Sequence, residues 1–217
     1  HLPVATVRER YGLVWMCPGD DSSATIPEIP EDDDGDYRRI NTGVEAWATS
    51  ATRMTDNFLD ISHFPWVHTG TFGIAQNTAV PKLELEPLDD SFFGYAYEVD
   101  ARNEQSAVTT GVDDDVVHRR MTTGFHLPFT VRSTIHYETG LDHIILLCST
   151  PVDDTNSLFT FVVWRNDDAS VPAEEVIAFD RAIGAEDKAM LERIGGVLPL
   201  DQHATASVQS DKPSVEW

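Results

Sequence analysis

Six strand-like segments follow one another through the middle of the chain and are joined by short polar turns. They lie near residues 79–88, 92–101, 116–123, 129–138, 143–150 and 158–165. From Phe129 to Tyr137 most apolar side chains fall on every second residue, which is the period of a strand with one buried face. Short connections favour antiparallel neighbours, because parallel strands need a long crossover. The pattern predicts an antiparallel meander.

One long helix is predicted after these strands, from about Pro172 to Ile194. Ser170 is the expected N-cap, proline suits the first turn, and Gly195-Gly196 supplies the stop. The predicted apolar stripe of this helix consists of Val176, Phe179, Ile183, Met190, Leu191 and Ile194. The stripe indicates that one face of the helix is buried.

Asp187 falls on this stripe, four residues after Ile183 and three before Met190. A carboxylate that faces the core is costly unless it is paired or binds a metal. The helix alone leaves two interpretations equally open: a metal ligand, or a carboxylate at the edge of the core that accepts from a backbone N–H or an arginine. Asp180 lies near the same face and is the rival candidate.

Length, charge and cysteine content narrow the class of protein. The 217 residues suit one domain with a sizeable core, or at most two small ones. The net charge of −22 argues against nucleic acid or an anionic membrane as a partner, because both would be repelled. Cys17 and Cys148 are too few for a disulfide framework or a cysteine-ligated cluster, so a reducing, cytoplasmic location is expected.

His63 and His68 lie five residues apart in the segment 57–68, NFLDISHFPWVH. Imidazole commonly binds transition metals, and a carboxylate usually orients its other ring nitrogen. Asp60 would share a helical face with His63 and make that contact. Residues five apart on a regular helix are rotated by roughly 140°. A shared metal therefore requires a break or a π-type widening, which Pro65 favours.

A competing interpretation is that the two histidines are ordinary, partly buried core residues. Aromatic residues surround them in the sequence, namely Phe58, Phe64, Trp66 and Phe72. These side chains indicate an aromatic or alicyclic ligand, but most of them are expected to belong to the core rather than to a pocket.

The full string resembles the mononuclear-iron motif of Rieske non-haem iron oxygenases, Asn-x-x-Asp-x-x-His-x-x-x-x-His. The following Thr71-Phe72-Gly73 is also similar to members of that family. In the family the third ligand is an Asp in an Asp-Lys or Asp-Arg step on a late helix, followed by Glu, and residues 186–192, EDKAMLE, fit this context. The resemblance thus implies an Fe(II) site formed by His63, His68 and Asp187, with Asp180 and Glu186 as weaker rivals.

The resemblance also implies the fold and two further site residues. The expected fold is an α+β helix-grip domain, in which a curved antiparallel sheet wraps around a long helix and leaves an apolar cavity beside the iron. Asp60 matches an aspartate that bridges the Rieske cluster and the mononuclear iron of neighbouring subunits. Asn57 matches an asparagine near the iron and outside its ligand set. Two histidines and one carboxylate on one face of iron leave positions open for O2 and substrate.

The family pattern divides the chain into three parts. Residues 1–17, which include ERYGLVW, resemble the last hairpin of a Rieske domain whose remainder is missing. Residues 18–36 are expected to form an acidic linker or surface loop, and residues 37–217 the catalytic mononuclear-iron domain, truncated at its C-terminus. The sequence lacks the Cys-x-His and Cys-x-x-His pairs that hold a [2Fe-2S] cluster, so this cluster is expected in the full-length protein but not in this chain.

The implied activity is that of an O2-dependent mono- or dioxygenase that hydroxylates or oxidatively demethylates an apolar, aromatic or alicyclic substrate. Electrons from NAD(P)H would arrive through a reductase, with or without a ferredoxin, and the assembly would be a homotrimer. A helix-grip carrier of an apolar ligand is the alternative, but a carrier has no reason to gather His63, His68 and Asp187 around one point. A zinc hydrolase is a weaker third reading, because it would want a general base beside the metal where Phe64 stands.

Overall fold

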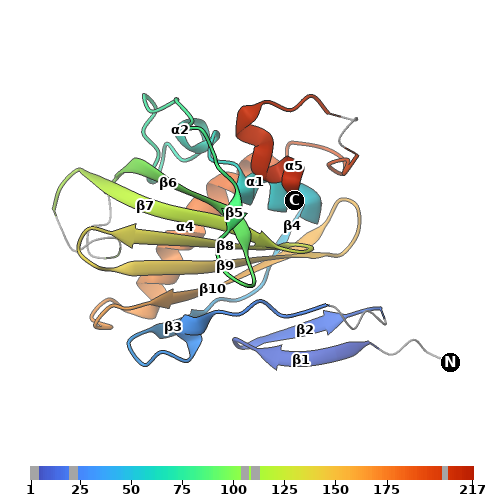
Figure 1. Ribbon diagram of the computed structural model, residues 1–217, viewed down its shortest axis with the longest axis horizontal. Coiled ribbons are helices and arrows are strands. Elements are labelled where there is room, and N and C mark those ends of the chain that lie inside the picture. Colours follow the sequence, from blue (N-terminus) through green and yellow to red (C-terminus); the bar gives the residue numbers. More distant parts are fainter. Residues whose placement is uncertain (1–4, 20–23, 104–107, 109–112, 202–204) are drawn as a thin grey trace.

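The computed structural model describes residues 5–19, 24–103, 108, 113–201 and 205–217, and a large antiparallel sheet dominates this part of the chain (Figure 1). Strands β6 to β10 pair in chain order, so the predicted meander is confirmed. At the edges β5 pairs with β6, whereas β3 and β4 pair with successive parts of β10. The eight strands are β3 (Arg38–Asn41), β4 (Glu45–Trp47), β5 (Glu86–Pro87), β6 (Phe93–Arg102), β7 (Val116–His126), β8 (Thr130–Tyr137), β9 (Asp142–Pro151) and β10 (Ser157–Arg165).

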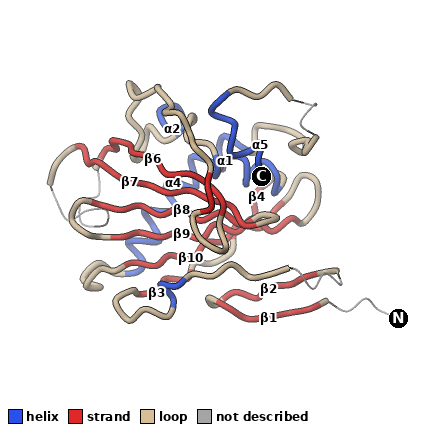
Figure 2. Tube along the Cα trace, in the orientation of Figure 1, coloured by secondary structure: helices blue, strands red, loops and turns tan. Residues whose placement is uncertain are grey.

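The long helix α4 (Ala173–Leu191) lies across one face of this sheet, behind the strands in Figure 2. The shorter helices α1, α2 and α5 gather near the top of the same view. Their bounds are Ala51–Leu59, Phe64–Val67 and Lys212–Glu216, and single 3-10 turns occupy Pro30–Asp32 and Gln209–Asp211. The predicted α+β helix-grip architecture is therefore confirmed. Within the described residues, no helix combines the length and the apolar character that a membrane crossing requires.

Alternation along β10 builds a core on both faces of the sheet. Phe161 and Val163 pack on the same side as Val176 of α4, in the larger core cluster. The intervening Trp164 packs on the opposite side, where Ile29 covers it. Successive side chains of a strand point to opposite faces, so one strand serves two layers. Burial of each such side chain contributes about 1.5–3 kcal/mol.

The outer layer makes the sheet more buried than the sequence predicts. Residues 24–36 lie within the expected linker, yet Ile29 is only 1% exposed; residues 20–23 of that linker lie outside the described part of the chain. The segment 129–138 was expected to bury one face, but β8 is buried on both, and Arg132 on its outer face pairs with Asp89 at 2.6 Å. A polar residue on alternate positions therefore does not mean a solvent-exposed face here.

The strand expected near residues 79–88 is reduced to Glu86–Pro87. Leu83 is buried and packs with Val80 and Leu85 against the strands in a third core cluster. Pro81 has no N–H to donate to a sheet ladder. The apolar spacing in this segment therefore reflects packing of an irregular chain rather than strand pairing.

The structure also tests the predicted N-terminal hairpin and the predicted ends of the long helix. The expected hairpin is confirmed as β1 (Thr6–Arg10) and β2 (Leu13–Cys17), joined by Tyr11-Gly12, both with positive φ. Helix α4 begins after Pro172, which is its N-cap in place of Ser170, and ends at Leu191 before the expected glycine stop. Assignment of the hairpin to a Rieske domain stays a prediction.

Candidate metal centre

The chain leaves α1 at Asp60, and this break places the two histidines. Asp60 has extended backbone angles, φ −92° and ψ 134°. Its Oδ1 accepts from the backbone N–H of Ser62 at 2.8 Å, and Oδ2 accepts from that of His63 at 3.2 Å. The side chain thus replaces the next helical hydrogen bonds and turns the chain. The expectation of a regular helix interrupted at Pro65 is wrong, because the break precedes His63, the N-cap of α2.

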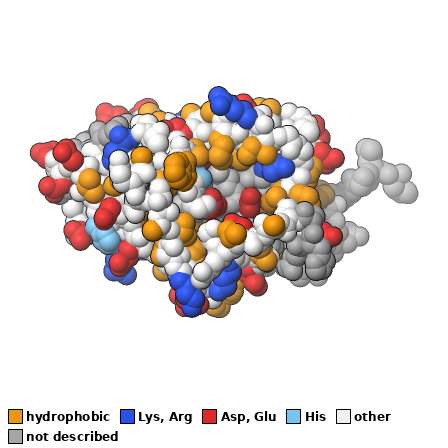
Figure 3. Space-filling view, turned by 90° about the horizontal axis from the view of Figure 1, so that it is seen from above, with side chains coloured by type: hydrophobic (Ala, Val, Ile, Leu, Met, Phe, Trp, Pro, Cys, Tyr) orange, Lys and Arg blue, Asp and Glu red, His pale blue; other side chains and the backbone are white. Residues whose placement is uncertain are grey.

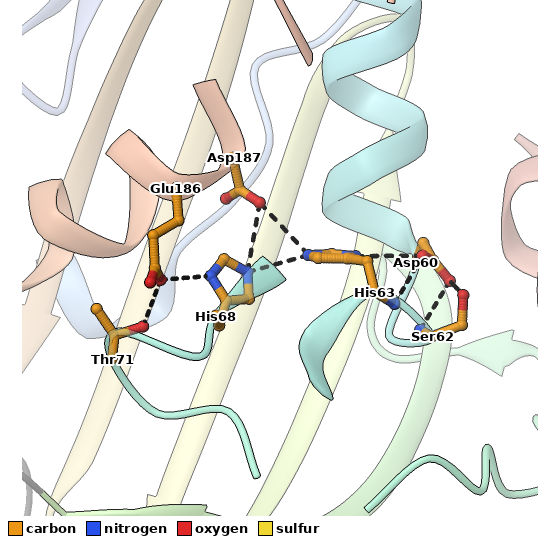
Figure 4. Close-up of polar contacts among 7 residues, drawn as sticks. All are labelled: Asp60, Ser62, His63, His68, Thr71, Glu186 and Asp187. Carbon is orange, nitrogen blue, oxygen red and sulfur yellow. Dashed lines mark hydrogen bonds and ion pairs between the residues drawn. The ribbon is translucent and has the colours of Figure 1, made fainter. Parts of the chain in front are cut away.

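Asp60 nevertheless makes the contact expected of it. Its Oδ2 lies 3.1 Å from Nδ1 of His63 (Figure 4). An ionised carboxylate can only accept, so Nδ1 carries a proton, and Nε2 is the ring nitrogen that could bind a metal after losing its own proton. Burial alone would raise the pKa of Asp60, but hydrogen bonds from His63 and Ser62 outweigh it and lower that pKa. Asp60 therefore stays charged and fixes the orientation of the His63 ring.

His68 is held in the same way by a different carboxylate. Nδ1 of His68 lies 3.0 Å from Oε2 of Glu186, which also accepts from the Thr71 hydroxyl at 2.7 Å. The other oxygen, Oε1, accepts from the backbone N–H of Gly70 at 2.8 Å. The ring of Phe72 stacks on the His68 ring with centroids 4.7 Å apart. These contacts leave Nε2 of a nearly completely buried imidazole as a free acceptor.

Asp187 of α4 completes a triangle of acceptor atoms. The two histidine Nε2 atoms are 3.0 Å apart, and Oδ1 of Asp187 lies 3.4 Å from that of His63 and 3.3 Å from that of His68. With a metal about 2.1 Å from each atom, a typical ligand distance, the ligand–metal–ligand angles would be roughly 90° to 110°. Three such ligands occupy one face of a metal ion and leave the opposite face open.

The electrostatics of the triangle favour a cation at its centre. Burial alone would lower the pKa of His63, but Asp187 and Asp60 outweigh it and raise that pKa to about 9. Burial would raise the pKa of Asp187, whereas the two imidazoles hold it well below its usual range. Oδ1 of Asp187 is buried without a hydrogen-bond partner of good geometry. Two ring nitrogens and a buried carboxylate oxygen that converge in this way fit a divalent metal, which would displace the proton that His63 carries in the metal-free site.

The structure separates the ligand candidates that the sequence left open. Asp180 points its Oδ2 at Nε2 of His143, 3.2 Å away, and does not join the triangle. Glu186 lies beside the site but contacts the far nitrogen of His68 (Figure 4). Asn57 is buried and lines the same cavity as the triangle, with an unpartnered Nδ2. Among the described residues, His63, His68 and Asp187 form the one group of His, Cys, Asp or Glu side chains with metal-like spacing.

The supporting role of Glu186 is the part of the site that the sequence analysis missed. Glu186 and Asp187 are consecutive, and neighbouring residues on a helix point about 100° apart. One turn of α4 can therefore offer one carboxylate to each nitrogen of His68. The sequence features that could have indicated this role are the acidic pair itself and Thr71 in the segment that follows the histidines.

An apolar cavity of about 120 Å³ opens beside the triangle. Engineered cavities of about 150 Å³ accept one benzene ring, so this space suits a small ring compound. The surface seen from above is hollowed near its middle, where histidine and acidic atoms are visible among hydrophobic side chains (Figure 3). Six phenylalanines line the cavity, namely Phe58, Phe64, Phe72, Phe159, Phe161 and Phe179.

The aromatic residues near the motif thus behave differently from the prediction. Phe58, on the last turn of α1, and Phe64 and Phe72, which follow the break after that helix, line the cavity rather than serving only as core. Trp66 is 69% exposed and lies outside it. The lining also includes polar side chains, among them Arg119 and Ser133.

Comparison with known proteins identifies the family to which this chain belongs. Residues 47–217 match the vanillate O-demethylase oxygenase C-terminal domain. The chain is 28% identical to methylxanthine N1-demethylase NdmA of Pseudomonas putida, over 96% of its own length and 57% of that protein. It is 27% identical to the probable methylxanthine N7-demethylase NdmC of Pseudomonas sp. (strain TJI-51), over 93% of its length and 71% of the relative.

Solved structures agree in fold. The Pseudomonas putida CBB5 NdmA structure with caffeine superposes with a TM-score of 0.79 at 25% identity, over 98% of this chain and 59% of the other. Dicamba monooxygenase bound to dicamba gives a TM-score of 0.73 at 19% identity, over 98% and 66%. The chain thus spans somewhat more than half of NdmA. It belongs to the vanillate O-demethylase oxygenase C-terminal domain family, the catalytic domains of Rieske non-haem iron oxygenases.

Proposed function

We propose that this chain binds one Fe(II) through His63, His68 and Asp187 and uses O2 to remove a methyl group from an O- or N-methylated ring compound. The observation that carries the proposal is the convergence of three buried acceptor atoms, two of them on carboxylate-oriented imidazoles, at one end of a phenylalanine-lined cavity. Two histidines and one carboxylate with open positions are typical of non-haem Fe(II) oxygenases.

Demethylation is favoured over ring hydroxylation by the family and by the names of the relatives. When bound, such an iron supplies the redox chemistry that O2 activation requires. In the overall reaction one oxygen atom enters a methyl C–H bond, and the other is reduced to water by two electrons and two protons. The hydroxymethyl product then breaks into formaldehyde and the demethylated ring. The side chains around the cavity position the methyl group and exclude water.

The electron route is also a proposal. Asp60, the partner of His63, would link this site to a [2Fe-2S] centre of a neighbouring subunit in a homotrimer, as the family resemblance implies. Reductase and, where used, ferredoxin would supply the electrons from NAD(P)H in the cytoplasm. Asn57 would donate from its free Nδ2 to a group in the cavity.

Iron content and product analysis test the central proposal. The full-length protein should hold one mononuclear iron per chain in addition to the cluster iron, and should release formaldehyde in step with NAD(P)H oxidation from a methoxylated ring substrate. His63→Ala and His68→Ala should lose both the mononuclear iron and formaldehyde release. His118→Ala is the matched control, because His118 is partly exposed on β7 and pairs with Asp100. Retention of iron in both site variants would refute the assignment.

Asp60 requires a separate test. Asp60→Asn should keep most of the mononuclear iron, because the ligands remain, but should slow its oxidation or reduction by the cluster in single-turnover experiments. Ser62→Ala is the control, since it removes only the hydroxyl that donates to Asp60 Oδ1 at 2.6 Å. Unchanged electron transfer in Asp60→Asn would contradict the bridging role.

A further inference from the structure

Arg119 is a buried cation in the wall of the cavity. It lies on β7, is 2% exposed, and lines the same space as the metal triangle. The rings of Phe72 and Tyr137 flank its guanidinium, with centroids 5.5 Å and 5.4 Å from Cζ. Its Nε and Nη2 atoms are buried and have no hydrogen-bond partner among the described residues.

The other two buried arginines differ from Arg119 in a decisive respect. Arg132 pairs with Asp89 at 2.6 Å, and Arg165 pairs with Asp167 at 2.7 Å. Arg119 has no carboxylate within 4.0 Å among the described residues, and its buried Nε and Nη2 donate to none of them. It is therefore the only buried arginine of the described chain that lacks an ion-pair partner.

Asp180, which also lines the cavity, faces His143 rather than Arg119. Arg165 donates to Nδ1 of His143 at 2.7 Å, and Nε2 of the same ring lies 3.2 Å from Asp180 Oδ2 without the geometry of a hydrogen bond. Asp167 additionally pairs with Arg38. Arg38 and Arg165 thus share Asp167, and the one ion-pair contact of Asp180 among the described residues is with His143. The positive charge of Arg119 is left over.

An unpaired buried charge is costly, and ring contacts offset only part of the cost. A guanidinium offers planar, paired donors that match a carboxylate. Arg119 is the one Lys or Arg among the described lining residues. Its contact Phe72 stacks in turn on His68, so one aromatic ring separates the guanidinium from the metal triangle.

We propose that Arg119 is a specificity-determining residue that binds an anionic group, most simply a carboxylate, on the substrate ring. The inference rests on the proposed function and refines its substrate class: a methylated ring acid, held at its carboxylate by Arg119 with the methyl group towards His63, His68 and Asp187. The neutral part of such a ring would contact the phenylalanines between the two ends.

A matched pair of probes tests whether Arg119 acts as a carboxylate-binding residue, or anchor. Anaerobic calorimetry on the iron-loaded protein should show that 4-methoxybenzoate binds at least about tenfold more tightly than 4-methoxybenzamide, as expected for hydrogen bonds between charged groups. In Arg119→Met the acid should lose this advantage while the amide binds nearly as before. Arg119→Lys should give an intermediate ratio, because it keeps the charge but not the paired donors.

Arg120→Met is the matched control, since Arg120 is the next residue of β7 and is exposed on the other face. It should change neither affinity by more than about twofold. If Arg119→Met unfolds, Arg119→Gln and Arg119→Lys provide the comparison, with thermal melting to verify folding. Equal binding of acid and amide, no binding of the acid, or an acid preference that survives loss of Arg119 would each overturn the inference.

The same titration on protein stripped of iron separates this inference from the function on which it rests. Acid binding that needs iron but not Arg119 would mean that the carboxylate ligates the metal, which overturns the anchor and leaves the oxygenase proposal intact. Arg119-dependent acid binding in a protein that takes up no iron would support the anchor and refute the proposed function.

Discussion

Glu186 and Asp187, consecutive residues of α4, contact opposite nitrogens of one imidazole, that of His68. Glu186 Oε2 lies 3.0 Å from Nδ1, and Asp187 Oδ1 lies 3.3 Å from Nε2. The ring is thus fixed from both ends by a single turn of helix. Carboxylates that contact the far nitrogen of a metal-binding histidine fix its tautomer and raise its basicity.

Glu186→Gln should weaken iron binding by about 10- to 100-fold without abolishing it, because the amide can no longer act as a charged acceptor for Nδ1 of His68. Competition with a chelator of known iron affinity provides the measurement. Glu175→Gln, on an exposed part of the same helix, is the control and should leave the affinity unchanged. Equal affinities in the two variants would mean that Glu186 has no role in tuning His68.

Asp187→Ala should reduce the mononuclear iron content to background, since it removes one of the three converging atoms. Asp180→Ala should retain the iron, because its carboxylate faces His143 instead. The second variant should still lose about 1–3 kcal/mol of folding free energy, the usual cost of leaving a buried partner unsatisfied. Metal analysis and denaturant unfolding check both statements. Loss of iron in Asp180→Ala alone would reverse the assignment.

Gly73→Ala should destabilise the protein and disturb His68. A Cβ at Gly73 would lie 2.4 Å from the carbonyl oxygen of Phe64 and 2.7 Å from that of His68, so the backbone must move. The expected loss is about 1–3 kcal/mol in the free energy of unfolding, with weaker iron binding. Gly35→Ala is the control, because its Cβ would meet no atom within 4 Å. Similar melting temperatures for the two variants would contradict this account.

The metal-free protein should lose stability as the pH rises through about 9. The pKa of His63 is raised from 6.5 to about 9 on folding, so its contribution is fully present below pH 6.5 and disappears above the folded value. The pKa of Asp187 is lowered, so its contribution is present above about pH 4 and is lost towards lower pH. Unfolding of the metal-free protein from about pH 2 to about pH 10 measures both effects.

Iron binding should show the opposite trend, because the metal must displace the proton on His63. The apparent affinity should therefore increase with pH up to about 9, with close to one proton released per iron at neutral pH. Calorimetry in buffers of different ionisation enthalpy measures this proton count. Release of no proton at neutral pH would show that His63 is already neutral in the metal-free protein.

The sequence predicted those features that depend on local pattern. Alternation and turn spacing located five of the six strands, and the helical stripe marked Asp187 as a buried carboxylate. The resemblance linked it to His63 and His68. The strand pattern, the helical stripe and the motif can each be recognised within a short segment of the chain.

Features that depend on long-range packing could not be read in this way. The outer layer over β9 and β10 includes Ile29, more than a hundred residues away in the chain. The segment around Leu83 has strand-like spacing but no partner for its backbone. Arg119 occupies an alternating position in β7, and only the assembled sheet shows that this position faces a cavity without a counter-ion.

One wall of the cavity is formed by a single helix. Asp180 and Asp187 of α4 both line it, seven residues apart, which corresponds to a rise of roughly 10 Å along the helix. The spacing of helical turns therefore sets where side chains of α4 can meet a ligand along this wall. A change in the ligand that the cavity accepts could thus come from substitutions on α4 one turn apart, without any change in the sheet.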